Sequence, residues 1–119
     1  MTFVIDGRQF EAFVGILEPG ETSVNVDEML IRTDEGGSVV GEEDLRFITE
    51  RLGQLPEELR RHDLVTKCPA TEAEYPHHVY LLRWRNALGA WNKGWLDRNA
   101  RMRWGASNIG SLRVLRRCA

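Results

Sequence analysis

The chain has 119 residues, a formal net charge of −2 and a hydrophobic fraction of 42%. This is the length of one ordinary domain, so we expect a single domain over residues 1–119. The composition is close to the globular average, which excludes a mainly disordered chain. The sequence holds no apolar run of ~18 residues that could span a membrane and no signal-peptide pattern at its start. With only two cysteines, far apart, we expect a cytoplasmic protein with reduced thiols.

The first two apolar-rich runs, residues 2–5 and 9–17, are separated by an Asp-Gly pair at Asp6 and Gly7. Such a pair between two runs of this kind predicts a β-hairpin, because a tight turn needs positive φ. The second run has apolar residues at alternate positions: Phe10, Ala12, Val14 and Ile16. We therefore expect an N-terminal antiparallel ribbon with these four side chains on one buried face.

The next stretch, residues 22–40, fits two structures. We favour a hairpin in which residues 29–31 form one strand, residues 34–37 the turn and residues 38–40 the returning strand. The alternative is a short helix over residues 27–33 that is ended by the two glycines after it.

Two central helices are predicted between residues 42 and 62. The first begins at Glu42 with three acids in its first turn, which favour the positive end of a helix dipole, and Gly53 follows its end. The second begins at Pro56 and extends to about His62, again with acids early and bases late. A short strand over residues 64–66 follows.

The last part of the chain is predicted to form an antiparallel meander. Residues 78–85 alternate, with Tyr80, Leu82 and Trp84 on one face and Arg83 and Arg85 on the other. Further strands are expected after a turn at residues 86–89, although a helix over residues 90–101 is the alternative for the next segment. The predicted fold class is α+β: an antiparallel sheet, made of the N-terminal ribbon and the C-terminal meander, with two central helices packed across it.

Charge is distributed unevenly along the chain. Residues 1–63 carry 15 acids and 6 bases, whereas residues 64–119 carry 3 acids and 10 bases and all four tryptophans. Arg and Trp are the residues most enriched in the hot spots of protein interfaces. The same residues could bind single-stranded nucleic acid, with cations on phosphates and indoles stacked on bases.

These features predict a non-catalytic binding protein, of inhibitor or adaptor type, that docks a protein partner through a basic Trp/Arg-rich surface. The alternative is a nucleic-acid-binding domain that uses the same surface; we prefer the protein partner because the whole chain is mildly acidic. The candidate binding residues are Arg83, Trp84, Arg85, Trp91, Lys93, Trp95, Arg101, Arg103 and Trp104.

Metal binding and catalysis have little support in the sequence. The two cysteines and the adjacent His77 and His78 do not have the short spacings of zinc ligands, so no metal or cofactor is expected. The chain also lacks a P-loop, G-x-G-x-x-G, G-x-S-x-G or H-E-x-x-H motif. A small enzyme that acts through the region of His77 and His78 is the third hypothesis.

Two C-terminal stretches, residues 91–97 and 112–117, combine Trp, Asn, Lys and Arg. Together they resemble the Trp/Asn-rich tails of small phage and prophage proteins. The resemblance covers under a third of the chain and implies a phage or prophage origin. It assigns no role to any residue.

Overall fold

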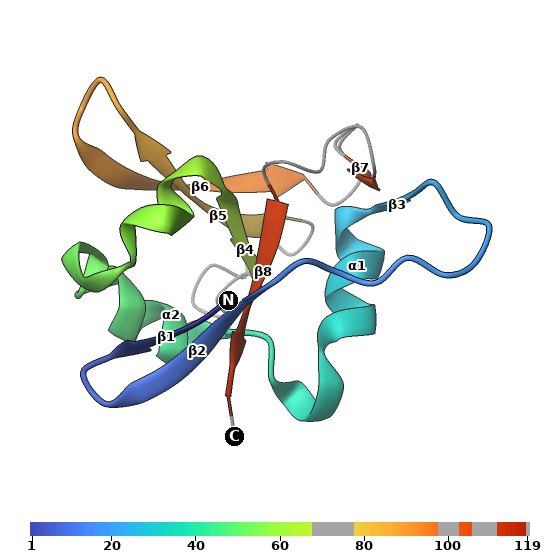
Figure 1. Ribbon diagram of the computed structural model, residues 1–119, viewed down its shortest axis with the longest axis horizontal. Coiled ribbons are helices and arrows are strands. Elements are labelled where there is room, and N and C mark those ends of the chain that lie inside the picture. The colour runs from blue at the N-terminus through green and yellow to red at the C-terminus, as the bar shows by residue number, and fades with distance from the viewer. Residues whose placement is uncertain (68–77, 98–102, 106–111, 119) are drawn as a thin grey trace.

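The computed structural model describes residues 1–67, 78–97, 103–105 and 112–118. Its centre is a curled six-stranded sheet, with α1 (Val26–Thr33) and α2 (Glu42–Thr49) at different sides of it (Figure 1). The strands of this sheet are β1 (Thr2–Ile5), β2 (Arg8–Phe13), β4 (Asp63–Thr66), β5 (His78–Arg85), β6 (Ala90–Asp97) and β8 (Leu112–Arg117). A second, two-stranded sheet pairs β3 (Ser23–Asn25) with β7 (Arg103–Gly105).

The six strands lie in the order β1-β2-β8-β4-β5-β6. All neighbours are antiparallel except β4 and β8, which run parallel with Val65 opposite Val114. The prediction of a purely antiparallel sheet is therefore wrong. The reason is that β8 enters the sheet between β2 and β4 instead of pairing with the strand before it, while β7 pairs with β3.

The N-terminal hairpin joins β1 and β2 through Asp6 and Gly7, whose φ angles are 44° and 82°. Two successive positive φ values define the type I′ turn that matches the twist of the flanking strands. The strand β2 ends at Phe13. Phe10 is fully buried on the predicted face, but Val14 and Ile16 lie beyond the strand and are exposed.

Residues 26–33 form the helix α1, so the favoured hairpin is wrong here and the helical alternative is right. The side chain of Asn25 caps the helix by accepting a hydrogen bond of 2.8 Å from the Glu28 amide. Met29 and Leu30 are buried, whereas Ile31 is 65% exposed. Two adjacent buried residues followed by an exposed one fit a helix, in which apolar side chains share one face, and not the strict alternation of a strand. From the sequence alone, three successive apolar residues do not distinguish a helix from a strand.

The predicted helix from Glu42 is α2, which ends at Thr49, slightly earlier than expected. The second predicted helix is the short 3₁₀ helix η3 (Glu57–Arg61), and another 3₁₀ turn, η2 (Leu52–Gln54), lies between them. Leu59 anchors η3 in the same hydrophobic cluster as Ile48. None of the helices in the described residues is long and apolar enough to cross a membrane.

The central strands separate two hydrophobic clusters. Leu64 faces the cluster that contains α2 and η3, and its neighbour Val65 faces the cluster that contains α1. Both residues are fully buried, as are Val114 and Leu115 at equivalent places on β8. The helices therefore cover both faces of the sheet, whereas the sequence predicted helices on one apolar face.

A comparison of two isoleucines tests this packing. Ile48 of α2 is fully buried, and Ile31 of α1 is 65% exposed. We expect Ile48→Ala to lower the free energy of unfolding by about 2–5 kcal/mol, because it leaves a cavity. The matched control Ile31→Ala should change it by less than about 0.5 kcal/mol. Urea unfolding measures both; equal losses would contradict the assignment of α1 and its exposed face.

The loop after β2 is fastened to α1 by Arg32, which contacts both oxygens of Glu21 at 2.6 and 2.8 Å. These hydrogen bonds lower the pKa of Glu21 from 4.5 to about 2. A lowered folded-state pKa stabilises the protein above the ordinary pKa, and that stabilisation is lost as pH falls toward the folded value.

Glu21→Gln should therefore unfold at a lower urea concentration than the wild type at pH 7. The difference between the two proteins should shrink between pH 4.5 and about 2, where the wild-type carboxylate becomes protonated. Urea titrations at a series of pH values measure it. A difference that stays constant down to pH 2 would show that the Glu21 carboxylate is not coupled to folding.

Candidate functional site

The centre of the candidate site is a pair of tryptophans on the β5–β6 hairpin. Trp84 lies directly opposite Trp91 in the strand register. Their rings meet edge to face with centroids 5.8 Å apart, an arrangement that aromatic pairs prefer. Trp91 is buried with 8% of its surface exposed, and Trp84 is half-buried and packs at the margin of the hydrophobic cluster. Of these two indoles, therefore, Trp84 is the one that solvent reaches more.

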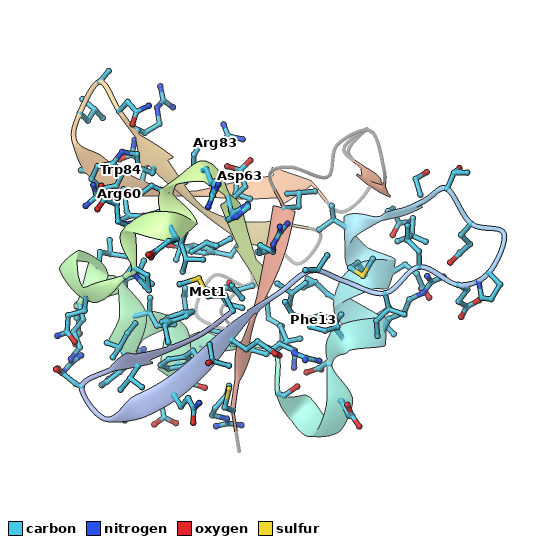
Figure 2. All side chains as sticks on the ribbon, in the orientation of Figure 1. Met1, Phe13, Arg60, Asp63, Arg83 and Trp84 are labelled. Carbon is cyan, nitrogen blue, oxygen red and sulfur yellow. The ribbon has the colours of Figure 1, made fainter. Side chains whose placement is uncertain are left out.

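Arg60, which the sequence prediction missed, lies on this tryptophan. Its guanidinium carbon is 4.0 Å from the centre of the Trp84 ring, within the range of a cation–π interaction. Figure 2 shows the two side chains side by side, Arg60 from η3 and Trp84 from β5. The indole nitrogen of Trp84 donates a hydrogen bond of 2.8 Å to the side-chain oxygen of Asn86. This bond fixes the ring's orientation, so that one face is presented to Arg60.

Two hollows lie beside Arg60 and Trp84, and both residues line each of them. The first, the Glu57 hollow, has a volume of about 490 Å³. Its lining residues are Glu57, Glu58, Arg60, Arg61, Trp84 and Asn86. The second, the Leu52 hollow, has a volume of about 320 Å³. Its lining residues are Leu52, Gly53, Arg60, Trp84, Gly89, Ala90 and Trp91.

The two hollows differ in charge. Among the described residues, the wall of the Glu57 hollow has two carboxylates and two guanidinium groups, whereas that of the Leu52 hollow has Arg60 as its one charged residue. Arg60 is also loosely paired with Glu57, at 3.8 Å. Nearby, burial lowers the pKa of Arg113, and the charge of Arg61 lowers it further.

The predicted arginines of β5 lie on the opposite face. Side chains alternate along a strand, so Arg83 and Arg85 point away from the face that carries Trp84. Arg83 is paired within the molecule: it donates two hydrogen bonds, of 3.0 and 2.9 Å, to the carboxylate of Asp63 on β4. Figure 2 shows these two side chains beside each other. These bonds raise the pKa of Arg83. Arg85 is exposed.

The remaining predicted residues divide into two groups. Lys93 is exposed and shares the face of Trp91, two residues further along β6. Arg101 lies outside the described residues. The backbones of three others belong to β6 and β7, but their side chains are outside the description: Trp95, Arg103 and Trp104. The described part of the site is therefore Trp84, Trp91 and Lys93, with Arg60 added.

Much of the uneven charge along the sequence is paired within the molecule. Ion pairs join acids of the first half to bases of the second: Glu11–Arg116, Asp34–Lys67 at 2.7 Å, Asp44–Arg117 at 3.5 Å and Asp63–Arg83 at 2.9 Å. The basic second half is thus in part a structural complement of the acidic first half. Near Trp84, by contrast, Arg60 lies on an aromatic ring that is only half-buried, and its contact with Glu57 is loose.

The residues proposed for a catalytic site are not tested by the structure. His77 is outside the described residues, and His78 begins β5 with a side chain outside the description. Among the described residues, no group of three or more His, Cys, Asp or Glu side chains is placed to hold a metal ion. The enzyme hypothesis therefore remains a prediction.

No family model, curated protein or solved structure matches this chain. The function is therefore inferred from the chemistry of the site itself.

The engagement of Arg83 by Asp63 can be measured by a double-mutant cycle. We expect Arg83→Ala and Asp63→Ala to show a coupling energy of about 0.2–1 kcal/mol in urea unfolding, the range for solvent-screened pairs. The matched control is the cycle with Arg85→Ala, because Arg85 lies on the same face of the same strand. Its coupling to Asp63 should be near zero. Equal couplings would contradict the specific pairing of Arg83.

Proposed function

We propose that this chain is a non-catalytic binding protein, of inhibitor or adaptor type, that docks a protein partner through the surface around Trp84. The observation that carries the proposal is the stacking of Arg60 on Trp84 between two hollows. Interface hot spots are enriched in Trp and Arg and are set in pockets that exclude water. A tryptophan held by a hydrogen bond to Asn86 also loses little conformational freedom on binding, which favours affinity.

The charges around Trp84 support a protein partner over nucleic acid. A nucleic-acid groove needs cations that follow the phosphate backbone. Here Glu57 and Glu58 line the larger hollow and would repel phosphates. Arg83 is already paired with Asp63, and Arg85 and Lys93 lie on opposite faces of the hairpin. Nucleic-acid binding through the exposed basic side chains of the same surface stays as the alternative.

The first experiment compares three immobilised proteins for capture from a lysate of the source cells: wild type, Trp84→Ala and Arg46→Ala. Arg46 is an exposed arginine of α2, 64% accessible, and serves as the matched surface control. We expect Trp84→Ala to lower the affinity for the partner by about thirtyfold, which corresponds to a hot-spot loss of about 2 kcal/mol. Arg46→Ala should capture the partner as well as the wild type does.

Circular dichroism of each variant checks that the fold is retained. Capture that is equal for wild type and Trp84→Ala would overturn the proposal. Saturable binding of single-stranded DNA or RNA that weakens by orders of magnitude between about 50 and 200 mM salt would favour the nucleic-acid alternative.

A further inference from the structure

The Leu52 hollow has the chemistry to select one kind of partner segment. We propose that it receives an apolar side chain from an acidic, extended segment of the partner, whose carboxylates bind Arg60 and Lys93. This inference rests on the proposed function and names the chemistry of the partner.

The wall of the hollow explains the apolar side chain. It is formed mainly by Leu52, Trp91 and the ring of Trp84, together with small residues at the start of β6. At about 320 Å³ it is at the lower end of the range for ligand sites, which suits one side chain better than a large cofactor. Burying an apolar group against two indoles gains contact area without leaving a polar group unpaired.

The positive charge of the hollow is the reason why we expect carboxylates in the partner segment. Arg60 is the one charged side chain that the described part of the chain places in its wall. When a guanidinium group stacks on an aromatic ring, its N–H groups point outward in its own plane, above the ring. A carboxylate can then accept hydrogen bonds from two of them. The 3.8 Å contact with exposed Glu57 is too long for a hydrogen bond and leaves this capacity largely free.

Lys93 supplies a second cation at a defined spacing. It lies two residues beyond Trp91 on the same face of β6, which places it about 6.6 Å further along the strand. In an extended partner segment, side chains two residues apart have the same spacing and point the same way. An apolar residue that enters the hollow beside Trp91 therefore brings a carboxylate two positions away to Lys93. The pattern expected in the partner is an apolar residue with an acid two positions from it.

The probe is a heptapeptide of glycine with a central phenylalanine and a glutamate two positions to each side. Binding is followed by the NMR resonance of the Trp84 indole N–H, which the hydrogen bond to Asn86 makes a specific reporter and which Trp84→Phe assigns. We expect a saturable shift at millimolar peptide. Peptides with lysine in place of glutamate, or alanine in place of phenylalanine, should bind at least fivefold more weakly.

Three variants locate the contacts. Lys93→Ala and Arg60→Ala should each weaken binding of the glutamate peptide at least threefold, whereas Arg46→Ala should leave it unchanged. For Arg60→Ala, the resonance of Asn86 serves as a second reporter, because removing the stacked guanidinium alters the Trp84 signal itself. Equal binding of the lysine and glutamate peptides, or no shift at millimolar peptide, would overturn the inference.

The result can be separated from the fate of the proposed function. Partner capture that depends on Trp84 but is not reduced by excess glutamate peptide overturns the acidic chemistry and leaves the docking surface in place. Capture that is independent of Trp84 overturns the docking surface itself.

Discussion

The fold depends on two neighbouring strands, β4 and β8, that are buried on both faces. Leu64 and Leu115 belong to the cluster beneath α2 and η3, while Val65 and Val114 belong to the cluster beneath α1. Because both faces of these strands are apolar, the sheet needs cover on each side; α1 covers one face, and α2 with η3 covers the other. The same burial places η3 against the end of the sheet, so that Arg60 reaches Trp84. The position of the site therefore follows from the central strands.

Many of the charged side chains pair with one another within the fold. Acids of the first half and bases of the second meet across β2, β8, β4 and β5, and the pairs Glu11–Arg116 and Asp63–Arg83 tie neighbouring strands together. Each exposed pair contributes little by itself, but a pair across two strands forms only in the native register and therefore favours that register. Outside these cross-strand pairs, Arg60 contacts Trp84, and Lys93 is exposed on the face of β6 that carries Trp91.

The parts of the fold that local pattern encodes could be predicted. The Asp-Gly turn, the helix from Glu42 and the alternating strand His78–Arg85 each have a signal within a few residues. The helix α1 was missed because three successive apolar residues fit either periodicity, although the capping residue Asn25 was a usable signal. The partners of β8 depend on contacts across the whole chain. For the same reason the sequence could indicate Trp84 and Trp91 as candidate site residues but not Arg60. Arg60 contacts the ring of Trp84 in the folded protein, but the two residues are far apart in the sequence.

The insertion of β8 between β2 and β4 has a consequence for how the chain reaches its native state. The hairpins β1–β2 and β5–β6 form from neighbouring residues, but β8 must pair with β2 near the start of the sequence and with β4 near its middle. Such long-range pairing is slow, because the entropy cost of closing the long loop comes before most of the stabilising contacts have formed. Until β8 docks, β2 and β4 each present an unpaired edge beside apolar surface, which neighbouring chains can use. The refolding yield should therefore fall as the protein concentration rises, because chains that pair through these open edges form aggregates.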